Sequence, residues 1–177
     1  MEQKESGVVH ALKETLEFER KGSEFYIKLG IETGQVLAKN LFFSLAKQEI
    51  DHIIRIEEIF GSIQRKSLWP EVSAKQTNEI EEQIREVFER LDRAARQEKL
   101  DNVKGYELAI DFEKRGYEMY RNLSGKATDE REKQFFGALA EEESKHLEAL
   151  DNVYHFLTEA EDWLATDESK AWNWMST

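Results

Sequence analysis

Residues 18–26 read FERKGSEFY, and a second copy, FEKRGYEMY, occupies residues 112–120, 94 positions further along the chain. The same shift carries LAKQEIDH at residues 45–52 onto LAEEESKH at residues 139–146. Each copy holds a Glu-x6-Tyr motif and, 30 residues after its Glu, a Glu-x-x-His motif. The chain therefore contains two related halves with matching polar residues. These are Glu19, Tyr26, Glu49 and His52 in the first half, and Glu113, Tyr120, Glu143 and His146 in the second.

Helix geometry predicts that the polar residues of each half converge. Residues three apart share a helix face, so Glu49 and His52 present a carboxylate and an imidazole to one point. In an antiparallel hairpin that turns at Gly34, Glu19 lies level with Glu49, and the second half has the same arrangement about Thr128. Two such hairpins placed face to face form a site of four carboxylates and two imidazoles. This is the inward-projecting pattern of di-iron and di-manganese helix bundles.

On these motifs the chain resembles the ferritin-like superfamily, and most closely the rubrerythrin-type di-iron domain, over nearly all of residues 6–158. The resemblance implies an all-α fold, an antiparallel four-helix bundle made from two duplicated helical hairpins with a crossover helix between them. It also implies two iron ions, although oxygen-rich ligation with one imidazole per ion suits manganese or a mixed Fe/Mn pair as well. Glu49 and Glu143 would bridge the ions. The implied metal ligands are Glu19, Glu49, His52, Glu113, Glu143 and His146.

Tyr26 and Tyr120 have two interpretations. The resemblance places them beside the metal ions, where they can hydrogen-bond a ligand or donate an electron. They are equally compatible with ordinary core aromatics. The other two histidines, His10 and His155, align with Lys104 and Gly61 under the shift, so we do not expect them to be ligands.

Hydrophobic periodicity predicts the helices and the division of the chain. The first helix should run from about Ser6 to Glu32 and the second from about Leu37 to Phe60. An amphipathic crossover helix should span roughly residues 76–97. A third helix should begin near Asp101, and a fourth should follow Asp129, whose spacing to Glu132 resembles a capping box. We therefore expect a single domain of residues 1–177. Its parts are a hairpin (6–61), a crossover segment (62–100), a second hairpin (101–158) and a Trp-rich tail (159–177).

The amino-acid composition limits the classes of binding partner and the cellular location that we expect for the protein. The chain is 40% hydrophobic and 35% charged, with a formal net charge of -12, which disfavours nucleic acid and an anionic membrane as partners. It has no cysteine, so thiolate catalysis and Cys-ligated iron are excluded. The N-terminus lacks the apolar core of a signal peptide, and no run has membrane-spanning length, so we expect a cytoplasmic protein. The apolar crossover and the tryptophan tail favour a homodimer.

The departures from the family pattern bear on function. A full rubrerythrin carries a Cys-rich rubredoxin domain, so electrons here would come from a separate donor such as a rubredoxin-like protein. Rubrerythrins also place an extra Glu at the position of Gly116, so the ligand count is closer to that of bacterioferritin. The favoured function is oxidation of Fe(II) at a dinuclear site with reduction of hydrogen peroxide or dioxygen, as in oxidative-stress defence. The alternatives are iron storage without peroxidase turnover and a helical interaction module with a vestigial site.

Overall fold

The computed structural model describes residues 7–66, 69 and 103–158, which contain four helices and no strand. They are α1 (Gly7–Glu32), α2 (Val36–Lys66), α4 (Val103–Lys126) and α5 (Glu130–Thr158). The all-α prediction is confirmed. None of the described helices is long and apolar enough to cross a membrane.

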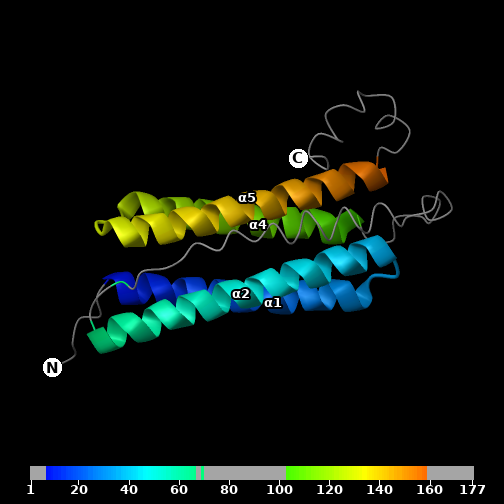
Figure 1. The fold of residues 1–177 in the computed structure, drawn as a ribbon. Helices are drawn as coiled ribbons and strands as arrows, with labels where there is room; N and C mark the ends of the chain where they lie inside the picture. The colour runs from blue at the N-terminus through cyan, green and yellow to red at the C-terminus, as the bar shows by residue number, and fades with distance from the viewer. Residues whose placement is uncertain (1–6, 67–68, 70–102, 159–177) are drawn as a thin grey trace, which may run out of the picture.

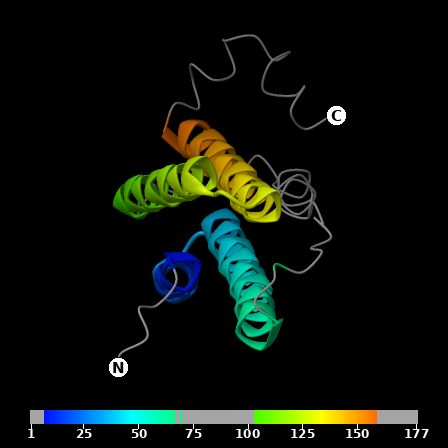
Figure 2. The same ribbon diagram turned by 90° about the vertical axis from the view of Figure 1, so that its left-hand side faces the viewer.

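The helices form two antiparallel hairpins, α1 with α2 and α4 with α5, that lie against each other (Figure 1). Figure 2, which views the bundle from one end, shows the two hairpins as separate layers. Across the layers α1 contacts α4, and α2 contacts α5. The non-helical connections are residues 33–35 and 127–129, so the predicted turns at Gly34 and Thr128 are confirmed.

Local hydrogen bonds explain where the helices end. The amide of Thr33 donates to the carbonyl of Leu29 (3.0 Å), which closes the last turn of α1. At the start of α5, Asp129 Oδ1 accepts from the amides of Arg131 (2.8 Å) and Glu132 (3.4 Å). Asp129 therefore caps α5 as its sequence position predicts, since a side-chain acceptor satisfies amides that lack an intrahelical partner.

Two apolar clusters fill the interior, one at each end of the bundle. The cluster nearer the connection at residues 33–35 includes the following buried residues: Tyr26, Phe42, Leu45, Tyr106 and Leu150. The cluster at the opposite end includes Leu12, Ile56, Tyr120, Phe136 and Leu139. Glu19 lies between Leu12 and Tyr26 on α1, and Glu49 between Leu45 and Ile56 on α2. The predicted polar residues therefore occupy a layer between two apolar layers.

The second helix is longer than predicted. We expected it to end near Phe60 and the first hairpin to end at residue 61, but α2 continues to Lys66. A glycine inside a helix costs only about 0.5–1 kcal/mol relative to alanine, so Gly61 does not stop it. Ile59 is buried and Ile63 packs on the same apolar cluster, which extends the amphipathic stripe past the glycine.

Some predicted features lie outside the described residues. They are the crossover helix at residues 76–97, the start of the third helix at Asp101 and the tail at residues 159–177.

A duplicated pair of glycines allows α1 and α4 to approach closely at the polar layer. A Cβ atom on Gly22 would lie 2.8 Å from Glu49 Oε2 and 2.9 Å from the Phe112 ring. A Cβ atom on its counterpart, Gly116, would lie 3.0 Å from the Phe18 ring and 3.3 Å from Glu143 Oε2. Phe18 and Phe112, themselves related by the repeat, stack with ring centroids 4.4 Å apart. These aromatic rings therefore occupy the space that side chains at the two glycine positions would need.

We predict that Gly22→Ala destabilises the protein by about 1–3 kcal/mol, because overpacking forces the Phe112 ring or the Glu49 carboxylate to move. Gly125→Ala in α4 is the matched control, since nothing lies within 4 Å of its added Cβ. Alanine is the better helix former, so the control should be neutral or stabilising. Urea unfolding of both metal-free variants gives the comparison. Equal stabilities would contradict the close approach.

Candidate metal centre

The structure brings all six predicted ligands together in the buried layer. They form two overlapping groups in which one ligand atom per residue lies within 4.8 Å of the others. Glu49 and Glu143 belong to both groups. Glu19 and His52 complete one group, and Glu113 and His146 complete the other. Every member is at most 1% exposed. The arrangement is that of two adjacent cation positions sharing two carboxylates.

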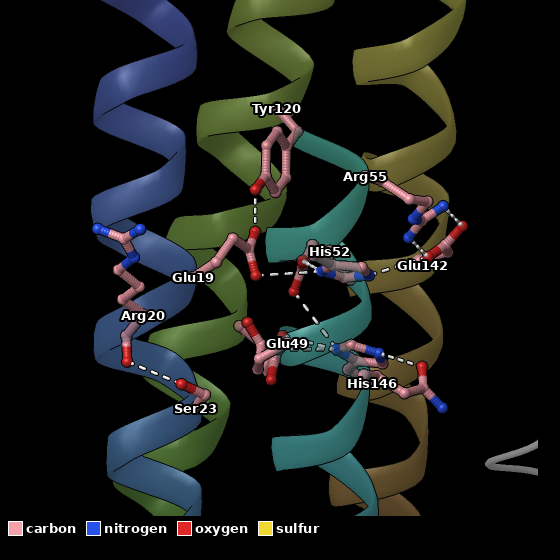
Figure 3. Close-up of polar contacts among 12 residues, drawn as sticks. Glu19, Arg20, Ser23, Glu49, His52, Arg55, Tyr120, Glu142 and His146 are labelled. Atoms are coloured by element: carbon pink, nitrogen blue, oxygen red, sulfur yellow. Dashed lines mark hydrogen bonds and ion pairs between the residues drawn. The ribbon is translucent and has the colours of Figure 1, made fainter. Parts of the chain in front are cut away.

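Each imidazole turns its Nδ1 atom toward the carboxylates. His52 Nδ1 lies 3.1 Å from Glu19 Oε2 and 3.4 Å from Glu143 Oε1. His146 Nδ1 lies 3.3 Å from Glu113 Oε2 and 3.5 Å from Glu143 Oε2. The two rings stack with centroids 5.6 Å apart, and Figure 3 shows His52 above His146. Nδ1 is thus the nitrogen of each histidine that is available to a metal ion.

The opposite ring nitrogen of each histidine is hydrogen-bonded to the other hairpin. His52 Nε2 lies 2.9 Å from Glu142 Oε2, and His146 Nε2 lies 2.7 Å from Gln48 Oε1. Carboxylate and amide oxygens only accept, so each Nε2 carries the hydrogen and donates it. In a neutral imidazole this leaves the Nδ1 lone pair free for a metal ion.

Arg55 reinforces the contact at His52. Its Nη1 atom donates to Glu142 Oε1 at 2.9 Å, and its Nη2 atom donates to Glu142 Oε2 (Figure 3). The sequence interpretation missed Gln48, Arg55 and Glu142. A usable signal was present, because positions 48 and 142 are related by the repeat and each precedes a histidine by four residues, which puts it on that histidine's helix face.

The two tyrosines donate hydrogen bonds to carboxylates of the opposite hairpin. The Tyr26 hydroxyl donates to Glu113 Oε1. The Tyr120 hydroxyl donates to Glu19 Oε1, as Figure 3 shows. The Oε2 atoms of the same carboxylates face the imidazoles. This favours the interpretation in which the tyrosines hydrogen-bond ligands over that of ordinary core aromatics.

The shared carboxylates supply the test of whether the residues fit metal ions. Among the described residues, neither oxygen of Glu49 and neither oxygen of Glu143 has a hydrogen-bond partner, although all four atoms are buried. Unpaired carboxylate oxygens in an apolar interior are costly. Two cations placed between the hairpins would satisfy them. The donor set therefore fits a dinuclear metal site.

Comparison with protein families agrees with this geometry. A family model described as Rubrerythrin matches residues 10–154. The chain belongs to the rubrerythrin family. Comparisons with curated proteins and with solved structures give no match. Family membership together with the bundle confirms the ferritin-like fold expected from the repeated motifs, and the buried Glu/His cluster fits the di-iron site of a rubrerythrin.

Without metal, the rubrerythrin site is a crowded set of coupled acids and bases. Burial and the nearby charges of Glu19 and Glu143 raise the pKa of Glu49 well above its usual range. Burial and Glu143 raise the pKa of Glu113 to about 8. Burial opposes the charged form of His146, but Glu113 and Glu143 outweigh it and raise its pKa to about 10. The metal-free site therefore retains protons that metal ions must displace.

Residues excluded from the site by the sequence lie elsewhere. His10 and His155 are not among the clustered ligands, and they pair with Glu14 and Asp151, each four residues away on its own helix. Glu17, Glu24 and Asp111, three other acidic residues of α1 and α4, are exposed.

We predict that the metal-free protein loses stability as pH rises from about 5 to about 9. Glu113 (pKa about 8, against 4.5) and His146 (pKa about 10, against 6.5) both bind protons more tightly in the folded state. Their stabilising contribution is complete below the unfolded pKa and is lost as pH climbs to the folded one, so it falls over pH 4.5–8 and 6.5–10. Glu142 has its pKa lowered to about 2, because hydrogen bonds from His52 and Arg55 outweigh burial, so its contribution changes only in acid.

Melting temperatures of chelator-treated protein at several pH values provide the measurement. Glu113→Gln removes one titrating group and should flatten the slope between pH 5 and 8. A melting temperature of the unmodified chain that rises over this range would show that the buried groups are not proton-loaded.

Proposed function

We propose that this rubrerythrin-family protein is an oxidoreductase that oxidises Fe(II) at its dinuclear site while reducing hydrogen peroxide or dioxygen. The observation that carries the proposal is the set of four buried oxygens on Glu49 and Glu143 that lack a hydrogen bond among the described residues, close to two imidazoles that each offer Nδ1. Such oxygen-rich ligation with one nitrogen per ion suits iron or manganese. When bound, two ferrous ions supply two electrons, the number required to reduce peroxide to water or dioxygen to peroxide.

The chain's own residues divide the work of holding that pair of ions. Glu49 and Glu143 would be shared by both ions, and Glu19 and Glu113 would each hold one. His52 would supply nitrogen to the ion beside Glu19, and His146 would supply it to the ion beside Glu113. Four carboxylates balance the four positive charges of two divalent ions, so the loaded site is close to neutral and tolerates burial.

The tyrosines control one oxygen of each terminal carboxylate. Burial and the charge of Glu113 raise the pKa of Tyr26 well above its usual value, so its hydroxyl stays protonated and remains a donor. Its hydrogen bond fixes the Glu113 carboxylate and keeps Oε1 engaged while Oε2 faces the site. Tyr120 does the same for Glu19.

The stacked Phe18 and Phe112 rings cover the site between α1 and α4. Both imidazoles come from α2 and α5, so the α1–α4 side carries fewer ligands and is the side on which a small oxidant would reach the ions. The aromatic pair restricts water there. Since the chain has no cysteine, we further propose that a separate protein, such as a rubredoxin-like donor, re-reduces the site.

Peroxide consumption by the reduced, iron-loaded protein tests the proposal. We expect about one peroxide to be consumed per two ferrous ions, and repeated consumption when a reductant is supplied. Oxidation with accumulation of many iron atoms per chain in a large assembly would instead favour storage. Failure to bind two ions would favour the interaction module.

Glu49→Gln should abolish binding of the second iron and most peroxide consumption, because it removes a charged ligand shared by both positions. In the metal-free protein the same change should leave the melting temperature unchanged or raise it, since glutamine is neutral without having to take up a proton on folding, as buried Glu49 must. Glu17→Gln is the control, because Glu17 is exposed, lies outside the metal-site cluster and pairs with Lys21. Iron content, peroxide consumption and melting temperature are measured for both. Full iron binding by Glu49→Gln would exclude Glu49 as a ligand.

Tyr26→Phe should retain both ions but change the rate of iron oxidation, because it frees Glu113 Oε1 without removing a ligand. Tyr106→Phe is the matched control: its hydroxyl is buried and has no hydrogen-bond partner among the described residues. Stopped-flow mixing of the ferrous proteins with peroxide compares the rates. Identical rates for both variants and the unmodified chain would show that the Tyr26 hydroxyl has no part in the oxidation.

A further inference from the structure

The twofold repeat of the bundle is broken at the residues that contact the two metal-site histidines. All six ligands and both tyrosines are matched between the halves, and so are the two glycines and two phenylalanines beside them. The hydrogen-bond partners of the histidines are not matched. Gln48 corresponds to Glu142, and Arg55 corresponds to Ala149. The two metal positions therefore have the same ligands but different surroundings.

On the His52 side, three residues form one connected unit. Glu142 reaches across from α5 and accepts from Arg55 through both oxygens, while its Oε2 atom also accepts from His52 Nε2 at 2.9 Å. Arg55 and His52 are three residues apart on α2, so a single carboxylate engages both. The guanidinium compensates the burial of Glu142 and fixes the carboxylate in two places. The orientation of the His52 ring is held by a charged, doubly anchored acceptor.

On the His146 side, the acceptor is the neutral amide of Gln48, and the residue that corresponds to Arg55 is an alanine. Gln48 Oε1 lies 2.7 Å from His146 Nε2. The position corresponding to Arg55 is Ala149, which is 1% exposed and carries no charge. An amide oxygen is a weaker acceptor than a carboxylate, because hydrogen bonds to charged groups are stronger than neutral ones.

We propose that the two metal positions are unequal, and that the position served by His52, Glu19 and the shared carboxylates binds its ion more tightly and fills first. An imidazole that donates to a carboxylate is a more basic ligand than one that donates to an amide, and a held ring loses less freedom on binding. The order of filling follows from Glu142 and Arg55, since the ligands of the two positions are the same.

The inference rests on the proposed dinuclear site. Ordered filling also affects how that site takes up metal ions. A site that fills in a fixed order holds one ion while it waits for the second. Such a site also accepts two different metals in a defined arrangement, with the stronger competitor beside His52. Inequality of this kind is a property of binding and is independent of whether peroxide is turned over.

Anaerobic titration of the metal-free protein with Co(II), followed by visible absorption and calorimetry, tests the proposal. The unmodified chain should bind two ions in two resolved steps. Glu142→Gln should weaken the tighter step by about 10- to 100-fold, leave the other step unchanged and so bring the two together. Glu141→Gln is the control: it is the exposed neighbour with the same change of charge, and it should leave both steps unchanged. Arg55→Lys keeps the charge but loses the double anchor, and should weaken the same step less. Arg55→Lys provides the test if Glu142→Gln does not fold.

Proton NMR of the Co(II) samples identifies the position that fills first. Each ligated imidazole should give a strongly shifted Nε2–H resonance. The first to appear should be the one that Glu142→Gln alters, and the second the one that Gln48→Ala alters. Two equal steps in the unmodified chain, or a Glu142→Gln effect equal on both steps or absent, would overturn the inference. A chain that binds Co(II) in order yet, loaded with iron, consumes no peroxide would leave the inference standing and defeat the proposed reaction. A chain that binds no Co(II) would defeat both.

Discussion

Four carboxylates and two imidazoles in one layer of an otherwise apolar interior are the constraint on which the bundle depends. Charges in such a setting are costly unless they meet partners, and four of the hydrogen bonds in this layer come from the opposite hairpin. Tyr26 and Tyr120 each donate across the interface between α1 and α4, and the two histidines each donate across that between α2 and α5. The polar layer is therefore also the seam that aligns the hairpins, because sliding one by a turn would break these four contacts together.

The apolar layers on either side of the polar layer disfavour any other alignment of the two hairpins. Leu12, Ile56 and Phe136 close one end of the polar layer, and Phe42, Leu45 and Leu150 close the other. The oxygens of Glu49 and Glu143 are buried between these layers and have no hydrogen bond among the described residues, which fits a site that cations would complete. The same burial explains the proton-loaded state of the metal-free site. Protons and metal ions neutralise one set of charges, and each must displace the other.

The sequence predicted the bundle and the six clustered residues because both depend on spacing along single helices. Equal distances from Gly34 and from Thr128 place Glu19 beside Glu49 and Glu113 beside Glu143 without knowledge of any tertiary contact. The partners of the histidines could not be obtained in this way. Helical periodicity places Gln48 and Glu142 on an inner face, but only the packing of the hairpins shows that each reaches the histidine of the other half. The extension of α2 past Gly61 was missed for a related reason, since the contacts of Ile63 outweigh a weak local preference.

The location of the asymmetry is informative about how a duplicated site can be tuned. Replacing one metal ligand would change the total charge and the number of donor atoms around an ion. In a buried site both quantities must stay balanced. Replacing the residue that accepts the hydrogen bond from a histidine Nε2 changes neither quantity. It alters only the basicity of the Nδ1 atom and how firmly the ring is held. A carboxylate that accepts this hydrogen bond is itself a costly buried charge. Arg55 compensates the charge of Glu142 from α2, the helix that also carries His52. The two differences, Glu142 against Gln48 and Arg55 against Ala149, thus form one unit. The buried carboxylate of Glu142 requires a cationic partner, and the neutral amide of Gln48 does not.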